Sequence, residues 1–244
     1  MQDRTPRIAL ITGANKGIGF EIARQIGRTG ALVLLGARDP ALGEAAAATL
    51  KGEGADVRFL PIDLTKPATI ASAAAAIGAE YGQLDVLVNN AGIADPADGP
   101  PGKADIDAVR RVFEVNLFGA LAVIQAMLPL LRKSRSARIV NVSSGLGSLT
   151  YNSDPAWPYA AVKLAGYNAS KAALNMLTIQ LAAELKDAGF KVNAADPGYT
   201  ATDLNGHRGH QTIPEGAEAA VRLALLPDDG PTGGFFNAAG PQPW

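Results

Sequence analysis

The sequence predicts a doubly wound α/β fold, in which a mostly parallel sheet of about seven strands carries helices on both faces. Short apolar runs alternate with segments of helical spacing along the whole chain, and most of the runs are almost continuously apolar. Such runs are typical of parallel strands that are buried on both faces. For 244 residues, a single domain over 1–244 is expected. The predicted strands are 7–12, 31–36, 56–62, 84–89, 137–143 and 190–195.

The segments between the predicted strands have the periodicity of helices. Isoleucine recurs every fourth residue over 18–26. The Ala-rich pieces 44–50 and 71–78 lie between strands, so they predict crossover helices that pack closely on the sheet. Loops rich in Pro and Gly at 94–102 and 145–158 follow the fourth and fifth strands. They are expected at the carboxyl edge of the sheet, where open α/β folds bind ligands.

Composition limits the class of protein. The net charge of −1 gives no reason to expect a nucleic-acid or membrane partner. The absence of cysteine excludes disulfides and thiolate metal sites. The first apolar run ends after six residues at Gly13, too short for the core of a signal peptide, and no apolar stretch approaches the roughly 18 residues of a membrane span. A cytoplasmic enzyme or binding protein is the simplest expectation.

A glycine-rich turn joins the first predicted strand to the first helix. Gly13, Gly17 and Gly19 have the spacing G-x-x-x-G-x-G rather than G-x-G-x-x-G. Glycines here allow a close approach of backbone to phosphate, and the free N–H groups of a helix start favour an anion. Taken alone, the turn is either a nucleotide site or a structural turn.

Four motifs in order strengthen the nucleotide interpretation: T-G-x-x-x-G-x-G, N-N-A-G at 89–92, a Ser, Tyr and Lys set, and P-G at 197–198. Together they span 12–202, and the chain resembles the short-chain dehydrogenase/reductase family, in particular its carbonyl-reductase-like members. The resemblance implies a Rossmann fold that binds NADP(H) or NAD(H). The cofactor-binding residues that it implies are Gly13, Asn15, Lys16, Gly17, Ile18, Gly19, Arg38, Asp63, Leu64, Asn90, Ala91, Gly92, Tyr167, Lys171, Pro197, Gly198, Thr200 and Thr202.

By the same resemblance, Asp63 contacts the adenine, Asn90 to Gly92 line the ribose, and Thr202 meets the nicotinamide carboxamide. Alternatives remain for two of them, since Asp63 could cap a turn and Asn90 could close a strand. The family's NAD-selecting acid usually stands where this chain has Ala37.

Charge near the adenosine ribose favours NADP(H) over NAD(H). Asp39 lies 20 residues after the last glycine of the turn, which taken alone favours NAD. Its position before a proline is more typical of a helix N-cap. Arg38 and Lys16 could neutralise a 2′-phosphate, although Arg38 could also be a solvated loop charge.

Two Tyr and Lys pairs are spaced four residues apart, as a proton-transfer pair on one helix face requires. A nearby ammonium favours phenolate and is expected to lower the pKa of a tyrosine. Tyr159 pairs with Lys163, and Tyr167 pairs with Lys171. The family's usual motif is Y-N-A-S-K, which this chain has at 167–171. The interval of 26 residues from Lys171 to Pro197 is also about that of relatives. The resemblance therefore assigns the acid to Tyr167, its electrostatic partner to Lys171, and a solvated charge to Lys163.

Ser144 is implied as the hydroxyl that orients the substrate carbonyl, with the adjacent Ser143 as the alternative. The 23 residues from Ser144 to Tyr167 exceed the family's usual interval, which implies an insertion at 145–166. Asn116 matches the asparagine of a water relay, although an isolated Asn could only hold a backbone group. The residues expected to line the substrate pocket are Leu146, Trp157, Tyr159 and Tyr199.

The segment 199–213 is expected to form a lid. Two histidines, His207 and His210, lie in it, but without cysteine or a nearby carboxylate they predict no metal site. The expected function is NADPH-dependent reduction of a small ketone or aldehyde. The alternatives are an NADP-dependent alcohol or steroid dehydrogenase acting oxidatively and a non-catalytic NADP-binding sensor. A homodimer or homotetramer is possible, and so is a monomer.

Overall fold

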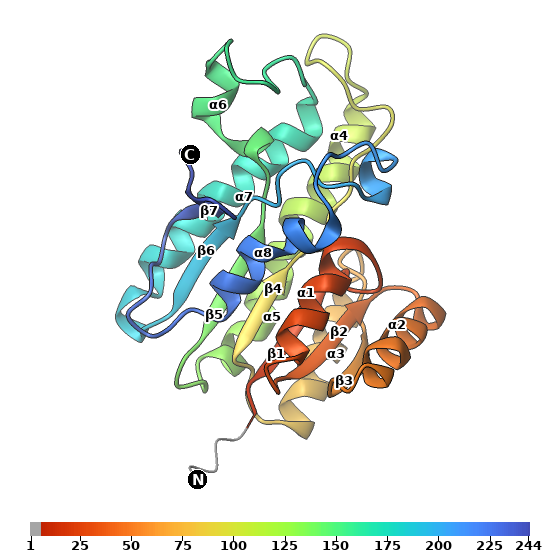
Figure 1. Cartoon of the computed structure of the whole chain (residues 1–244), viewed down its shortest axis with the longest axis vertical. Helices are drawn as coiled ribbons and strands as arrows, with labels where there is room; N and C mark the ends of the chain where they lie inside the picture. Colours follow the sequence, from red (N-terminus) through yellow and green to blue (C-terminus); the bar gives the residue numbers. More distant parts are fainter. Residues whose placement is uncertain (1–5) are drawn as a thin grey trace.

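The structure, a computed structural model, describes residues 6–244 as one central sheet between two layers of helices (Figure 1). The strand order is β3-β2-β1-β4-β5-β6-β7-β8, and every pairing is parallel except the last. The predicted fold class is confirmed, with a two-residue eighth strand added at the edge. The strands are β1 (Ile8–Thr12), β2 (Leu32–Ala37), β3 (Val57–Pro61), β4 (Val86–Asn89), β5 (Arg138–Val142), β6 (Lys191–Ala195), β7 (Phe235–Asn237) and β8 (Gly240–Pro241).

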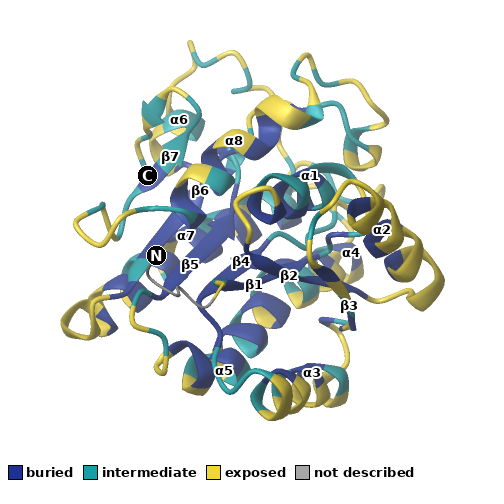
Figure 2. Cartoon of the chain, turned by 60° about the horizontal axis from the view of Figure 1, so that its bottom comes forward, coloured by how far each residue is buried: buried dark blue, intermediate teal, exposed yellow. Residues whose placement is uncertain are grey.

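Helices cover both faces of the sheet (Figure 2). Each helical layer packs against the sheet through one apolar cluster. In β1, Leu10 packs with α3, α5 and α7, whereas Ile11 packs with α1, α2 and α8, because successive strand residues point to opposite faces. The helical elements are α1 (Gly17–Gly27), α2 (Pro40–Gly52), α3 (Pro67–Glu80), α4 (Ile106–Phe113), η1 (Glu114–Gly119), α5 (Ala120–Leu131), η2 (Gly145–Gly147), α6 (Leu149–Ser153), α7 (Ala165–Glu184), η3 (Lys186–Ala188), η4 (Asp203–Asn205) and α8 (Ile213–Ala224).

The Ala-rich pieces form α2 and α3, which are crossover helices as expected. The side chain of Asp39 accepts a hydrogen bond from the backbone N of Leu42 at 3.0 Å, and Pro40 follows it in the first turn. Asp39 is therefore the N-cap of α2. This capping agrees with the interpretation that the residue starts a helix rather than selecting NAD.

One helical run among residues 6–244, Ile106–Leu131, is long and apolar enough by composition to span a membrane. The run is not a continuous apolar stretch, because polar residues such as Glu114 and Asn116 interrupt it. Val123, Ile124 and Met127 of this run lie in the hydrophobic core. Burial of this kind is typical of a core helix, so the run is only weak evidence for a membrane span.

Strand order reverses between β1 and β4, which lie side by side although about 75 residues separate them. Crossovers on opposite sides of this point leave a crevice at the carboxyl ends of the two strands, where ligands bind in folds of this kind. The glycine turn, the N-N-A-G motif and the ends of β5 and β6 all lie along this edge.

Candidate active site

The glycine turn is shaped by its contacts with the N-N-A-G motif. Gly13 has φ +63°, and a Cβ there would lie 2.9 Å from the Cα of Ala91. A Cβ on Gly19 would lie 2.3 Å from Nδ2 of Asn90. Both distances are shorter than real Cβ contacts, so only glycine fits. The turn and the motif after β4 therefore form one close-packed unit.

Hydrogen bonds hold that unit together. Nδ2 of Asn90 donates to the carbonyl oxygens of Thr12 at 2.9 Å and Gly13 at 3.1 Å. The hydroxyl oxygen of Thr12 accepts from the backbone N of Asn90 and of Ala91, each at 3.1 Å. The side chain of Asn90 thus closes the strand ends, as the structural alternative expected, and this scaffold presents the first turn of α1 to the crevice.

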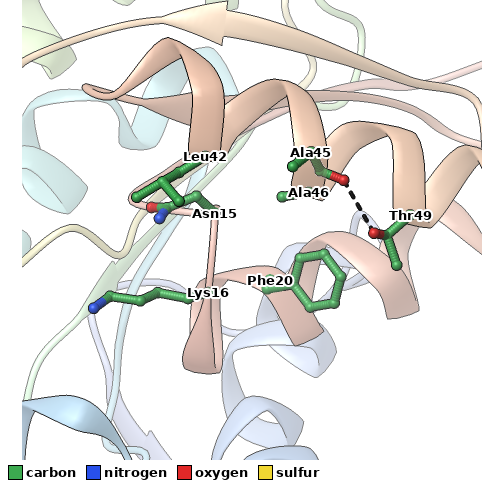
Figure 3. A pocket seen from close by; sticks show the side chains of 7 residues that line it. All are labelled: Asn15, Lys16, Phe20, Leu42, Ala45, Ala46 and Thr49. Atoms are coloured by element: carbon green, nitrogen blue, oxygen red, sulfur yellow. Dashed lines mark hydrogen bonds between the residues drawn. The ribbon is translucent and has the colours of Figure 1, made fainter.

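The start of α1 has the features of an anion site. Among the described residues, no side chain caps this helix, whose N-cap is Lys16. Uncapped N–H groups at a helix start favour a phosphate. Beside the turn lies a groove of about 280 Å³ (Figure 3). Its lining residues are Asn15, Lys16, Phe20, Leu42, Ala45, Ala46 and Thr49.

Lys16 lines this groove, and a second cation, Arg38, directly precedes Asp39, the N-cap of α2. Arg38 follows β2 directly and is exposed. Lys16 is also exposed, and its Nζ lies 2.5 Å from Oδ2 of Asp203 in the segment expected to form a lid. Because the glycine cradle, the uncapped helix start and these cations occur together, the residues present fit a dinucleotide with an additional phosphate.

Three other residues expected to bind cofactor lie in the loops that follow β3 and β6. Thr202 lies over the glycine turn, since a Cβ on Gly17 would be 3.9 Å from its Cγ2. Gly198 has φ +68° in the P-G turn after β6. Asp63 accepts hydrogen bonds from the backbone N and the hydroxyl of Thr65, which is the turn-capping role that was its alternative.

The two Tyr and Lys pairs lie in different kinds of structure. Tyr167 and Lys171 both belong to α7, whereas Tyr159 and Lys163 lie in turns and irregular backbone before it. Nζ of Lys171 is 5.8 Å from the centroid of the Tyr167 ring and donates to the carbonyl oxygen of Val142 at 2.8 Å. Lys163 is exposed. Only the second pair therefore has the helical geometry that the proton-transfer hypothesis needs.

The two adjacent serines after β5 point in different directions. Ser144 is hydrogen-bonded to Tyr167, and its Oγ also accepts from the backbone N of Leu146 at 3.1 Å. The hydroxyl of Ser143 is buried and donates to Oδ1 of Asn175 on α7 at 2.5 Å. The serine beside the tyrosine is thus Ser144.

Burial dominates the electrostatics of the pair. It raises the pKa of Tyr167 to about 12, while the hydrogen bond with Ser144 lowers that pKa and the negative charge of Asp196 raises it. Burial also lowers the pKa of Lys171 to about 8. Removal of both groups from water disfavours phenolate and ammonium alike, and the lowering of the tyrosine pKa by Lys171 together with the nicotinamide ring stays a prediction.

Asn116 lies in η1, a π-helical turn between α4 and α5. Its Oδ1 accepts from the backbone N of Ile93 at 2.8 Å, and its Nδ2 donates to the carbonyl oxygen of Ile93 at 3.0 Å and to the hydroxyl of Ser170 at 3.1 Å. The side chain thus joins the N-N-A-G loop to α7. The water relay stays a prediction.

A row of rings links the residues expected to line the substrate pocket. Trp157 stacks on Tyr151 with centroids 5.1 Å apart and meets the edge of Tyr159 at 5.4 Å. The ring centroids of Tyr159 and Tyr199 are 5.9 Å apart, and those of Tyr199 and His210 are 6.0 Å apart. The row joins the segment 145–166 to the segment 199–213. Leu146, half-buried in η2, precedes it in the chain.

The family pattern described as short chain dehydrogenase matches residues 7–212. The chain belongs to the short-chain dehydrogenase family. It is 35% identical to salutaridine reductase of Papaver bracteatum over 96% of this chain and 94% of the relative. It is 35% identical to (+)-neomenthol dehydrogenase of Arabidopsis thaliana over 97% of this chain and 98% of the relative. The structure of NADPH-bound carbonyl reductase from chicken fatty liver superposes with a TM-score of 0.85, at 28% identity, covering 99% and 100% of the two chains.

The family expected from the motifs is confirmed, and this short-chain dehydrogenase is an oxidoreductase. Within residues 6–244, no three His, Asp or Glu side chains gather where they could hold a metal ion. His207 instead places its Nε2 2.8 Å from Oδ1 of Asp203.

Sequence reasoning missed two carboxylates next to Tyr167 in this short-chain dehydrogenase. Asp98 accepts hydrogen bonds from the backbone N of Gly166 at 2.9 Å and of Tyr167 at 2.8 Å. Asp196 is buried at the end of β6. The position of Asp196 directly before the P-G motif was a usable signal. Asp98 had none, because an aspartate in a Pro- and Gly-rich loop is ordinary and its partners lie 68 residues away.

Proposed function

We propose that this short-chain dehydrogenase reduces a ketone or aldehyde to an alcohol with NADPH. The observation that carries the proposal is the arrangement of Tyr167 beside Ser144, with Lys171 one turn further along the same helix, at the sheet edge that also holds the glycine turn. The glycine turn and Lys16 would hold NADPH, which when bound would provide the hydride for the carbonyl carbon.

The chain's own residues handle the oxygen and the proton. The hydroxyl of Ser144 donates a hydrogen bond to the carbonyl oxygen and stabilises the negative charge that develops there. Tyr167 then delivers its phenolic proton to that oxygen. The ammonium of Lys171, which burial leaves with a pKa of about 8, stabilises the phenolate that remains.

Reduction uses Tyr167 as the neutral phenol. With its pKa raised to about 12, Tyr167 is a neutral phenol at neutral pH and is ready to act as an acid. Oxidation of an alcohol needs the phenolate as a base, which this environment disfavours. A dehydrogenase acting oxidatively remains the second candidate, supported by its likeness to (+)-neomenthol dehydrogenase.

The choice of NADPH over NADH is supported by charge. Ala37 stands where an acid would repel a 2′-phosphate, and Arg38 with Lys16 offers two cations near the helix start. The relative from chicken fatty liver is NADPH-bound. We therefore expect a lower KM for NADPH than for NADH. The cytoplasmic location and the possible homo-oligomer remain predictions.

The experiment follows the loss of NADPH absorbance with a panel of aryl ketones, ketoesters and aldehydes, and repeats it with NADH. Turnover with at least one carbonyl compound, faster with NADPH, is expected. Binding of NADPH without turnover on any member of the panel or its alcohols would favour the sensor alternative. Turnover only with alcohols and NADP⁺ would favour the oxidative one.

A further inference from the structure

Asp196 stands at the junction of two loops that meet at the active site. It follows β6 directly, and 9% of its surface is exposed. Its Oδ1 accepts a hydrogen bond from the backbone N of Gly198 at 2.9 Å, within the P-G turn. The backbone N of Gly145 also donates to this carboxylate. One buried side chain thus joins the loop after β6 to the loop after β5.

The second partner of Asp196 is next to the serine beside Tyr167. Gly145 follows Ser144, and a Cβ on Gly145 would lie 3.2 Å from Oδ2 of Asp196 and 3.3 Å from Cζ2 of Trp157. The carboxylate and the indole therefore leave little room for a side chain at this position. Because the N–H of Gly145 is bonded to the carboxylate and Gly145 is adjacent to Ser144, a shift of the carboxylate is transmitted to the hydroxyl beside Tyr167.

We propose that Asp196 is a positioning residue, whose carboxylate fixes the Ser144–Gly145 peptide against the Pro197–Gly198 turn and sets its negative charge near the phenol of Tyr167. The inference rests on the proposed reduction, in which Ser144 and Tyr167 act together on the carbonyl oxygen. It assigns a role to a buried acid that the proposed proton transfer leaves unused.

Charge explains the second part of the role. Four groups face Tyr167: Ser144 after β5, Lys171 on its own helix, Asp98 at its backbone N, and Asp196 after β6. Ionisation of the phenol would place a second negative charge near Asp196, and like charges in a buried site oppose each other. The carboxylate accordingly raises the pKa of Tyr167.

The carboxylate itself is held in a mixed environment. Burial raises the pKa of Asp196, and the two N–H donors, Gly198 and Gly145, lower it. The two N–H donors favour the ionised carboxylate, whose negative charge opposes ionisation of the nearby phenol of Tyr167.

The test compares wild type with Asp196→Asn, Asp196→Glu and a control, Asp187→Asn, at an exposed aspartate beyond the other end of α7. The pH dependence of kcat/KM for carbonyl reduction is measured from neutral to alkaline pH. Asparagine keeps the size but removes the charge and one acceptor. We expect kcat to fall about tenfold, and the alkaline limb to move to lower pH by on the order of one unit.

Asp196→Glu retains the charge on a longer side chain. It is expected to lower kcat, because the Gly145 peptide is displaced, while the alkaline limb stays near the wild-type position. Asp187→Asn is expected to leave both unchanged. If Asp196→Asn lowers kcat/KM by the same factor at every pH, the charge has no influence on Tyr167 and the inference is overturned.

A second readout needs no substrate. Tyrosinate absorbance is titrated for each protein and for its Tyr167→Phe counterpart, and the difference isolates Tyr167, while circular dichroism checks that the chain stays folded. The Tyr167 transition should occur at lower pH in Asp196→Asn than in wild type. An unchanged transition contradicts the inference, whether or not wild type reduces a carbonyl. If wild type reduces no carbonyl, only the proposed function is overturned. If Asp196→Asn does not fold, Asp196→Ser replaces it in the titration, with the same expectation.

Discussion

Two buried groups set the chemistry at the scale of single residues. Tyr167 is a neutral phenol because burial outweighs the hydrogen bond from Ser144, and Lys171 carries its charge into a buried site against the same cost. Removing a charge from water in the folded chain lowers the free energy of unfolding. The charge is kept because the proposed function needs it.

Lys171→Met tests that cost. Below about pH 8 the folded and unfolded chains both carry the ammonium, so the folded chain bears the full cost of burying it. The cost declines as the pH rises from about 8, because the folded chain loses the proton first. It disappears above the ordinary lysine pKa of 10.5, where both chains are neutral. We expect the variant to be more stable than wild type by about 1–3 kcal/mol at neutral pH, and inactive. Urea unfolding at neutral and alkaline pH measures the difference, which should shrink at the higher pH.

The matched control for that variant is Lys163→Met, at the exposed lysine of the first pair. Its free energy of unfolding should follow that of wild type at both pH values, because no desolvation is relieved. A Lys171→Met protein that is less stable than wild type at neutral pH would contradict the assigned cause.

Gly19→Ala tests the close packing of the glycine turn. The added Cβ would lie 2.3 Å from Nδ2 of Asn90 and 2.6 Å from the carbonyl oxygen of Gly13, so the turn must move. We expect a loss of about 1–3 kcal/mol in the free energy of unfolding and weaker NADPH binding. Gly52→Ala, in α2 with no atom within 4 Å of its Cβ, should instead gain about 0.5–1 kcal/mol. Thermal unfolding and NADPH fluorescence titration distinguish the two; equal effects would refute the packing argument.

At the scale of elements, the start of α7 depends on a loop that is distant in sequence. Its N-cap residue, Leu164, makes no side-chain cap, and Asp98 after β4 accepts from the backbone N of Gly166 and of Tyr167 instead. A carboxylate at a helix start also interacts favourably with the helix dipole. The loop 94–102 therefore fixes the end of the helix that carries the tyrosine.

Asp98→Ala removes this cap. We expect the free energy of unfolding to fall by about 1–2 kcal/mol and kcat to fall more than KM rises, because Tyr167 loses its fixed position while the crevice remains. Asp107→Ala, in an exposed pair with Arg110, should change stability by less than about 0.5 kcal/mol. The interpretation is refuted if the two variants are equally stable and equally active.

At the scale of the whole molecule, the parallel core could be predicted and its edge could not. The buried strands β1, β2 and β4 are nearly continuous apolar runs, so their own residues predict their burial. The short strands β7 and β8 lack such a run. They are defined by their pairing, of β7 with β6 and of β8 with β7 after a tight turn. The order of the motifs along the chain was sufficient for the family.

The same limit applies to the site. The spacing within Tyr167 and Lys171 is local, so it could be predicted from the chain. The contacts of Asn116 with Ile93, and of Asp98 with the start of α7, join segments 23 and 68 residues apart, and no local pattern contains them. The pKa of Tyr167 likewise depends on burial, which the tertiary structure determines.

The most direct measurement of the central claim compares NADPH oxidation by wild type, Tyr167→Phe and Tyr159→Phe with one carbonyl substrate that wild type accepts. Both variants lose a single hydroxyl, but only Tyr167 lies on α7 with Lys171 and Ser144 beside it. The account predicts that Tyr167→Phe abolishes turnover and that Tyr159→Phe retains it with altered substrate preference. Abolished turnover in Tyr159→Phe, with activity retained in Tyr167→Phe, would contradict it.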